Sequence, residues 1–468
     1  MKTLQSVMHL RTFSFLILCS LFLISCSVST KISKSAKNTV LNAAPLKTAH
    51  IGISIYDPET GKYLYNYQGD KYFVPASNTK IPTCYAAMKY LGDSLVGLRY
   101  EIHDFGEDEP DTLIRIEPTG DPTFLHPDFK SQPVFEFLKK NKYGLHITKP
   151  FFYEKYFGSG WSWNDALESY MAPRSFFPIY GNVVRFTVYN KADISITPSY
   201  FKKNNLSVIG TNDTVPDVTR SYNDNNFIFS KIFYEKPWEV RLPDKRYFEI
   251  PFLPRSGIIE SLLSDTLGNR KFSYPFVKPV PGLGLFIVAN IKNPKIIHSQ
   301  PTDTLLKPMM HRSDNFFAEQ SLLMVSNERL GYMDDNKIID TLLKTDFKDL
   351  PQKPRWADGS GLSRYNLFTP QDFVAILNKM KNEFGMERIK TIFPTGGEGT
   401  ISSYYKAGNG YVYAKTGTLS GVVALSGFLY TKKGKLLIFS TLVNNHQATS
   451  TEVRRAVERF IESVREKY

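Results

Sequence analysis

The sequence predicts a mixed α/β (α+β) protein in which a core domain is interrupted by a large strand-rich insertion. Helix and strand patterns occur together near both ends of the chain, at residues 38–98 and 298–468. Residues 99–297 instead are rich in Asp, Asn, Pro and aromatic residues, with short strand patterns and many turn signals. A chain of 468 residues has room for two to four compact units at roughly 100–200 residues each, so separate domains are expected.

The N-terminal residues predict export. Lys2 and Arg11 precede an apolar stretch at 13–24, which has the length of a secretory signal rather than of a membrane span. The stretch ends in the letters LISC, which resemble the lipobox of bacterial lipoproteins. The resemblance implies that residues 1–25 are a signal peptide and that Cys26 becomes the lipid-attached N-terminus in the periplasm, anchored to a membrane. An ordinary signal peptide cut elsewhere and an uncleaved anchor are the alternatives.

The elements of the predicted core follow in order. Residues 26–37 are polar and predict a flexible tether. Residues 50–56 and 62–67 alternate around a turn and predict a β-hairpin, and a helix pattern starts at Ser77. The C-terminal part predicts a helical stretch from Leu305 through Met324, strands at 411–415, 422–430 and 436–442, and an amphipathic helix at 451–468.

Composition excludes several classes of protein. Apolar residues make up 42% and charged residues 22%, which excludes wholesale disorder. The net charge is +13, but no compact Lys/Arg-rich run occurs, so we expect no nucleic-acid partner. Outside the N-terminal segment only Cys84 occurs, which we expect to be a small core residue. There is no Cys/His cluster and no HExxH pair, so the sequence predicts no metal site and no cofactor.

Three short motifs indicate a shared reaction centre. They are Ser77-Asn78-Thr79-Lys80, Ser313-Asp314-Asn315 and Lys415-Thr416-Gly417. Each is weak alone, and Ser313 or Asp314 with Asn315 could simply cap the helix that follows. Their order and context add weight, since Ser77 opens a predicted helix, Ser313 precedes one, and Lys415 ends a predicted strand.

The residue types fit nucleophilic catalysis. A serine hydroxyl needs an adjacent base, and Lys80 lies three residues after Ser77 on the same helix face. A lysine acts as a base only when its pKa is lowered, which burial and a second cation at Lys415 would both do. Ser313 can pass a proton between the lysines and the leaving group, and Asn315 can hold a substrate amide.

Other groups near the motifs fit a bound acyl substrate. Orphan backbone N–H groups at the start of a helix lie near Ser77, and one can hold an oxyanion together with the N–H of Thr418. Thr416 and Lys415 suit a substrate carboxylate. Asp358-Gly359-Ser360-Gly361 is expected to be a structural turn near the site, and Trp161 and Trp163 are expected to pack inside the insertion.

Together these motifs resemble the D-alanyl-D-alanine carboxypeptidase/endopeptidase family of low-molecular-mass class C penicillin-binding proteins (peptidase family S13). The resemblance covers roughly residues 40–468 and includes four separated signatures in the right order: PASNTK at 75–80, RSDNFFAE at 312–319, DGSGLSR at 358–364 and AKTGT at 414–418. Gly120-Asp121-Pro122 and Trp161-x-Trp163 also resemble the family. The chain departs from it at Pro82 inside the first helix and at the glycine-rich segment 396–400, which is one acidic residue short.

The resemblance implies a serine β-lactamase/transpeptidase-like catalytic core, an antiparallel sheet flanked by helices, at 38–98 plus 298–468. It implies Ser77 as acyl-enzyme nucleophile, Lys80 as general base, Ser313, Asn315 and Lys415 completing the catalytic site, and Thr416, Gly417 and Thr418 as substrate-binding residues. The implied partners are peptidoglycan peptide stems and β-lactam antibiotics. A β-lactamase, a transpeptidase and a non-catalytic wall-binding scaffold are the rival functions.

Overall fold

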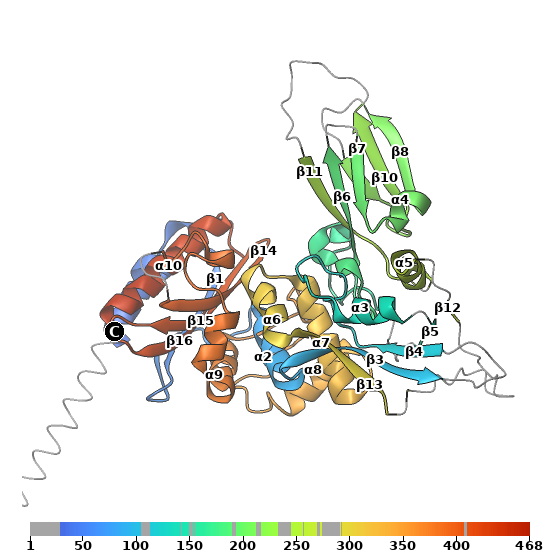
Figure 1. The fold of residues 1–468 in the computed structure, drawn as a ribbon. Coiled ribbons are helices and arrows are strands. Elements are labelled where there is room, and N and C mark those ends of the chain that lie inside the picture. Colours follow the sequence, from blue (N-terminus) through green and yellow to red (C-terminus); the bar gives the residue numbers. More distant parts are fainter. Residues whose placement is uncertain are drawn as a thin grey trace, which may run out of the picture.

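The core of the protein is a five-stranded antiparallel sheet built from both ends of the chain. The computed structural model describes residues 29–103, 113–141, 143–148, 152, 155–189, 193–211, 217–232, 245–255, 257–268, 272–273, 291, 293–406 and 410–468. The strand order is β14-β15-β16-β1-β2, so two N-terminal strands continue a C-terminal meander (Figure 1). The strands are β1 His50–Asp57, β2 Lys62–Tyr67, β14 Val412–Leu419, β15 Val422–Tyr430 and β16 Leu436–Asn444. This arrangement confirms the predicted α/β core and its two hairpins.

Helices cover both faces of this sheet because its central strands are apolar on both sides. Phe428, Ile438 and Leu442 pack on one face with helices α2, α6, α7, α8 and α9. Val423, Leu437 and Phe439, which alternate with them, pack on the other face with α10. The helices of this core are α2 Lys80–Tyr90, α6 Thr302–His311, α7 Asn315–Leu330, α8 Asp335–Lys344, α9 Pro370–Ile392 and α10 Ser450–Lys467.

The N-terminal segment corrects one expectation. Residues 29–36 are helical and continue into a π-helical turn at Lys37–Leu41, so the predicted flexible tether is wrong from residue 29 onward. Ile32, Ala36 and Val40 recur every four residues and are buried against α10, and Ser35 donates to Ser463 at 2.6 Å. This apolar stripe orders a segment that is otherwise polar. Residues 1–25 and Cys26 lie outside the described residues.

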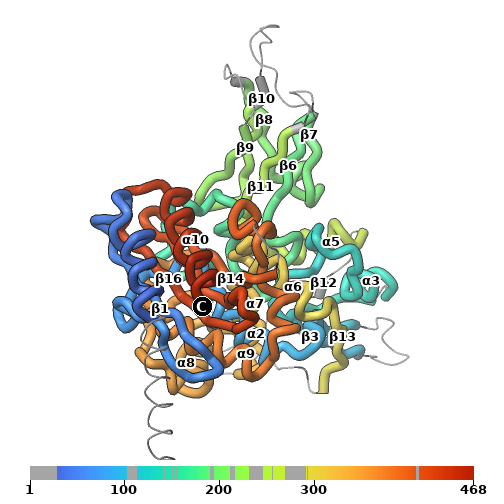
Figure 2. The backbone as a smooth tube through the Cα atoms, turned by 90° about the vertical axis from the view of Figure 1, so that its left-hand side faces the viewer, coloured from blue at the N-terminus to red at the C-terminus, as the bar shows by residue number. Residues whose placement is uncertain are grey.

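The middle of the chain forms three further sheets. One has the order β12-β5-β4-β3-β13, and two three-stranded sheets have the orders β11-β6-β7 and β8-β10-β9. A separate apolar cluster lies within and between these sheets, and Figures 1 and 2 show the strands β6 to β11 projecting away from the core. The strands are β3 Ser94–His103, β4 Leu113–Pro118, β5 Gly144–Ile147, β6 Val183–Tyr189, β7 Asp193–Thr197, β8 Leu206–Thr211, β9 Asp217–Arg220, β10 Phe227–Ile232, β11 Lys245–Pro251, β12 Phe272–Ser273 and β13 Lys295–Pro301. The helices are α3 Pro133–Lys140, α4 Tyr200–Asn204 and α5 Ile258–Thr266.

The chain leaves and re-enters the core through one antiparallel pair of strands. Strands β3 and β13 pair along their length. Directly before β3 and directly after β13, the Thr302 N–H donates to the Asp93 carbonyl at 2.9 Å. The expected boundaries, between residues 98 and 99 and between 297 and 298, both fall inside these strands. A boundary before β3 and after β13 would keep each strand whole.

In the described part of the chain, every helix is too short or too polar to cross a bilayer. The same residues contain no group of three or more His, Cys, Asp or Glu side chains that could hold a metal ion. Cys84 is a buried free thiol in α2, as expected of a small core residue.

Candidate active site

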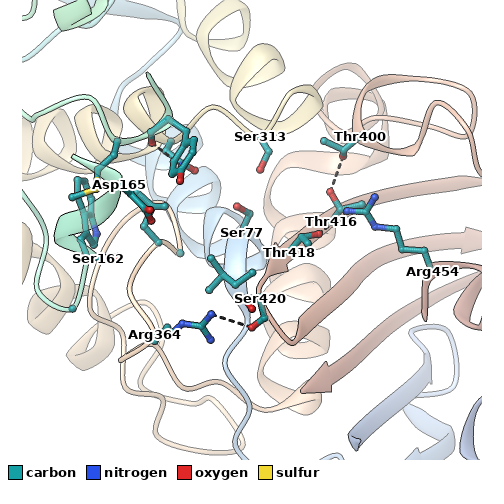
Figure 3. A pocket seen from close by; sticks show the side chains of 18 residues that line it. Ser77, Ser162, Asp165, Ser313, Arg364, Thr400, Thr416, Thr418, Ser420 and Arg454 are labelled. Carbon is teal, nitrogen blue, oxygen red and sulfur yellow. Dashed lines mark hydrogen bonds between the residues drawn. The ribbon is translucent and has the colours of Figure 1, made fainter. Parts of the chain in front are cut away.

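Ser77 lies at the edge of a cleft of about 720 Å³ between the core and the middle part of the chain (Figure 3). It sits in a 3₁₀ turn at Ala76–Thr79, directly before α2. Pro82 is the third residue of α2 and has no N–H to donate, so the regular helix begins only at Lys80. The proline therefore leaves a tight turn that holds Ser77 at the cleft.

Lys80 is fully buried and contacts the serine. Its Nζ donates to Ser77 Oγ at 3.0 Å, to Asn315 Oδ1 at 2.6 Å and to the Ser360 carbonyl at 2.8 Å. These three acceptors use all three protons of an ammonium group. When Lys80 loses one proton, its lone pair faces the Ser77 hydroxyl at hydrogen-bond distance, which is the geometry required of a general base.

Burial lowers the pKa of both lysines of the site. Burial lowers the pKa of Lys80 to about 8. Three carboxylates oppose this shift: Asp358, Asp314 and Glu319. Burial also holds the pKa of Lys415 well below its usual value, and the positive charges of Lys80 and Arg454 add to that shift. The charge repulsion expected between the two lysines therefore lowers the pKa of Lys415. The pKa of Lys80 is lowered by burial, which lets this amine act as a base near neutral pH.

Ser313 and Asn315 approach the same point from the start of α7. Asp314 caps this helix by accepting the Phe317 N–H at 2.9 Å, which leaves the two neighbouring side chains for other contacts. Ser313 Oγ accepts from Lys415 Nζ at 2.9 Å. Asn315, besides contacting Lys80, donates its Nδ2 to the Tyr170 carbonyl at 2.9 Å. The three motifs thus meet, with one hydroxyl held by each lysine.

Strand β14 forms the other wall of the cleft. Lys415 lies in the middle of this strand, so the expectation that it ends a strand is wrong. Thr416 Oγ1 donates to Thr400 Oγ1 at 2.7 Å, which brings the glycine-rich segment to the site. Thr418 also lines the cleft, and Figure 3 shows both threonines on the side facing Ser77.

Two glycines let other backbone segments approach the Ser77 turn. A Cβ on Gly417 would lie 2.5 Å from the Pro75 carbonyl oxygen and 3.0 Å from the Ser77 nitrogen. A Cβ on Gly361 would overlap the Ala76 carbonyl, and this glycine has a φ of +87°. Gly417 therefore acts through its missing side chain, because β14 can continue past Ser77 only without a Cβ there.

A buried charge network lies behind Lys80. Glu319 accepts the Ser360 N–H at 2.7 Å, while Arg174 contacts Glu319 at 3.4 Å and Asp335 at 2.5 Å. Burial raises the pKa of Glu319 to about 7, against the charge of Arg174. Arg174 belongs to the middle part of the chain, so this part completes a network that ends at Lys80.

The Asp358 turn is structural, as expected, but it also connects to the cleft. Asp358 accepts the N–H groups of Gly361 and Ser363 at 2.8 and 2.7 Å, and the Trp161 indole at 2.8 Å. Trp161 is thus a hydrogen-bonding residue of the cleft wall as well as a packing residue. Trp163, expected to be packed, is 72% exposed.

Several cleft residues were missed at the sequence level. They were not predicted as site residues and are Asp165, Tyr170, Arg364, Thr400 and Arg454. Of these, only Arg364 and Thr400 fell in segments that the sequence singled out. Arg454 lies on α10, whose amphipathic pattern indicated only a packing helix.

Comparison with known proteins gives a consistent result. The sequence matches the D-Ala-D-Ala carboxypeptidase 3 (S13) family over residues 34–226 and 295–464. It is 24% identical over 479 residues to the D-alanyl-D-alanine carboxypeptidase DacB of Haemophilus influenzae, covering 92% of this chain and 93% of that protein. It is also 24% identical to a D-alanyl-D-alanine carboxypeptidase of Actinomadura sp. (strain R39), covering 87% of this chain and 80% of that protein.

The fold is also found among solved structures. The crystal structure of penicillin binding protein 4 (dacB) from Haemophilus influenzae superposes with a TM-score of 0.68 at 21% identity, covering 92% of this chain and 97% of that one. The same protein complexed with a β-lactam superposes with a TM-score of 0.64 at 20% identity, with the same coverage. The fold of this chain, including its middle part, is thus that of a known penicillin-binding protein.

Proposed function

This chain belongs to the D-Ala-D-Ala carboxypeptidase 3 (S13) family and is a serine-type D-Ala-D-Ala carboxypeptidase, and from this premise we propose that Ser77 is its nucleophile and Lys80 its general base. The observation that supports these roles is the 3.0 Å contact between Lys80 Nζ and Ser77 Oγ. The contact lies in a cleft that Ser313, Asn315 and Thr416 also line. A buried amine beside a hydroxyl is the arrangement that activates a serine.

The first step forms an acyl-enzyme. Neutral Lys80 takes the proton of Ser77 while Oγ attacks the carbonyl carbon of the penultimate D-alanine, and the backbone N–H groups of Ser77 and Thr418 hold the oxyanion. The carbon–nitrogen bond then breaks. The leaving amine takes a proton through the Ser313 hydroxyl, which lies 2.9 Å from Lys415 Nζ. Asn315 binds an amide of the substrate, and Thr416 binds a carboxylate.

The second step restores the serine. A water molecule attacks the ester carbonyl, Lys80 accepts the water proton, and Ser77 Oγ leaves with a proton returned by the lysine. The products are the shortened peptide and free D-alanine. With a cross-linked substrate, the same two steps cut the bond between two peptide stems.

The substrates are the peptide stems of peptidoglycan, and β-lactams acylate the same serine. The relatives named D-alanyl-D-alanine carboxypeptidase and the related structure that contains a β-lactam support this assignment. The net charge of +13 is compatible with an anionic wall polymer.

Residues 1–25 are the signal peptide and Cys26 the lipid attachment site, which would anchor the exported enzyme to a membrane. The LISC letters before and at Cys26 support this. The catalytic domain is formed by residues 38–98 plus 298–468, with 99–297 as the inserted part. The β3–β13 pair supports an inserted part that is a few residues longer at each end, so that both strands belong to it whole. Replacing Cys26 by Ser should release the protein from the membrane fraction, and a protein that stays there unchanged would rule out the lipid anchor.

The proposed function is tested with a peptide that ends in D-Ala-D-Ala. Release of D-alanine by the purified protein should fall by at least about a thousandfold in Ser77→Ala, since loss of a nucleophile removes most of the catalysed rate. Cys84→Ala is the matched control, because Cys84 is on helix α2, which directly follows the Ser77 turn, but is buried away from the cleft. Equal hydrolysis by Ser77→Ala and wild type would rule out Ser77 as the nucleophile.

A further inference from the structure

A side pocket of about 420 Å³ adjoins the active-site cleft. Trp161 and Met171 line both spaces. The other described residues that line the side pocket are uncharged and are Phe157, Gly158, Trp163, Ala166, Tyr222 and Asn223. The cleft, in contrast, is lined by Asp165, Arg364 and Arg454 among others. The side pocket therefore suits an uncharged ligand with an apolar face, bound next to the reaction centre.

Two exposed aromatic rings line the side pocket. Trp163 is 72% exposed and Tyr222 is 49% exposed. Their ring centres lie 5.8 Å apart, with an angle of 60° between the ring planes. The rings come from separate segments, since Trp163 begins a 3₁₀ turn at Trp163–Asp165 and Tyr222 lies in the loop between β9 and β10. Two large rings brought together at a hollow and left open to water are typical of a binding surface.

The loop that carries Tyr222 is fixed from inside the protein. Arg220 is buried directly before this loop, and its Nε donates to the Pro251 carbonyl at 2.8 Å. Asn225 is also buried, and its side chain accepts the Leu253 N–H at 2.7 Å and donates to the Leu253 carbonyl at 3.0 Å. Both sides of the loop are thus tied down, so a ligand at Tyr222 does not have to order the loop when it binds.

The segment that carries Trp163 is fixed as well. The Trp161 indole donates to Asp358 at 2.8 Å, and Ser363 Oγ donates to the Ser159 carbonyl at 2.6 Å. Both contacts join this segment to the turn that follows Asp358 in the core. The two rings therefore have a fixed position relative to the cleft, which lowers the entropic cost of binding between them.

The side pocket lies on the acyl side of the bond that is cut. Figure 3 shows Ser162 and Asp165, which are close to Trp163 in the sequence, at the end of the cleft away from Thr416, with Ser77 between. The proposed function places the leaving carboxylate at Thr416, so the acyl part of the stem peptide extends toward the opposite end. In peptidoglycan the far end of this acyl part is attached to the glycan strand.

We propose that the side pocket binds an N-acetylhexosamine unit of the glycan strand that carries the stem peptide. This inference rests on the proposed function and extends it from the peptide to the glycan part of the substrate. The apolar C–H face of a pyranose ring can pack on the face of Trp163 or Tyr222, and the Asn223 amide can exchange hydrogen bonds with an acetamido or hydroxyl group. The sugar is uncharged, as are the lining residues. Trp163 and Tyr222 are specificity-determining residues and take no part in the proton transfers.

The test compares two substrates that differ only in the sugar. One is a stem pentapeptide that ends in D-Ala-D-Ala, and the other is the same peptide attached to the disaccharide of N-acetylglucosamine and N-acetylmuramic acid. The kcat and KM of D-alanine release are measured for wild type, Trp163→Ala, Trp163→Phe, Tyr222→Ala and Tyr247→Ala. Tyr247, on β11, is 71% exposed and does not line the side pocket, so it controls for the loss of an exposed ring. Acylation by benzylpenicillin, which has no sugar, checks that each variant has an intact active site.

We expect wild type to have a lower KM for the disaccharide substrate than for the free peptide. Trp163→Ala and Tyr222→Ala should each raise the KM for the disaccharide substrate about threefold to tenfold, as loss of one aromatic contact predicts, with kcat and the KM for the free peptide unchanged. Trp163→Phe should keep part of the preference, and Tyr247→Ala should keep all of it.

Equal KM values of wild type for the two substrates would overturn the inference. An equal rise for both substrates in Trp163→Ala would also overturn it, because the side pocket would then bind the peptide rather than the sugar. Failure of the proposed function looks different, since wild type would then release D-alanine from neither substrate.

Discussion

Glu319 and Lys80 are joined through the backbone of a single residue, Ser360: Glu319 accepts the Ser360 N–H at 2.7 Å, and Lys80 donates to the Ser360 carbonyl at 2.8 Å. The carboxylate thereby orients Lys80, the proposed base, through the Ser360 backbone. Its negative charge also opposes the loss of a proton from Lys80. Glu319 therefore positions Lys80 and raises the pKa of its ammonium group.

Replacing Glu319 by Gln should move the pH dependence of acylation. The loss of the negative charge removes one cause that raises the pKa of Lys80, so the midpoint should fall below that of wild type. The measurement is the rate of penicillin acylation against pH. Glu328→Gln, on the same helix but in an ion pair with Arg99 outside the cleft, is the control and should leave the midpoint unchanged. An unchanged midpoint in Glu319→Gln would contradict the positioning role.

The wild-type enzyme should acylate faster as the pH rises to about 8. Only neutral Lys80 can accept the serine proton, and burial lowers its pKa to about 8. Below that pH the neutral fraction falls about tenfold per pH unit, and above it the rate should level off. Acylation rates between pH 5.5 and 9.5 check this. A flat profile, or one still rising steeply at pH 9.5, would be inconsistent with Lys80 as the base.

Gly361→Ala should abolish acylation in a protein that still folds. The new Cβ would overlap the Ala76 carbonyl and displace the Ser77 turn. Gly434→Ala is the matched control, because Gly434 also has a positive φ of +77° but nothing lies within 4 Å of its Cβ. Gly434→Ala should lose about 1–2 kcal/mol of unfolding free energy from backbone strain, and Gly361→Ala should lose more because its Cβ also displaces the Ala76 carbonyl. Only Gly361→Ala should lose at least about a hundredfold in acylation rate. Equal acylation by the two variants would show that the glycine is not needed at the turn.

Arg174→Met should destabilise the whole catalytic core. It would leave Glu319 and Asp335 buried without their shared cation, at a cost of about 3–5 kcal/mol in the free energy of unfolding. Arg185→Met removes a partly exposed ion pair with Glu249 and should cost about 1 kcal/mol or less. Urea unfolding measures both. A similar loss in the two variants would mean that the buried network contributes little.

Local sequence motifs were enough to predict which side chains the fold brings together at the cleft, but not the groups around them. Ser77, Lys80 and Lys415 each lie in a short motif, and the three motifs meet in the structure. Thr400 and Arg454 enter the cleft only because β14 lies between the glycine-rich segment and α10, a relationship that no local pattern contains.

The errors in the predicted elements have the same origin. The strand expected to end at Lys415 continues to Leu419, because Gly417 has no Cβ and lets the strand pass close to the Ser77 turn. The polar segment at 29–36 is helical because its few apolar residues pack on α10, at the other end of the sequence. Both outcomes depend on tertiary contacts that override local preference.

The most direct measurement is the intact mass of the protein after incubation with benzylpenicillin, for wild type and Ser77→Ala side by side. Wild type should gain the mass of one penicillin, located on the peptide that contains Ser77, and Ser77→Ala should gain none. A long-lived adduct would also distinguish the peptidase from a β-lactamase. An adduct of equal amount on both proteins would contradict the assignment of Ser77 as the nucleophile.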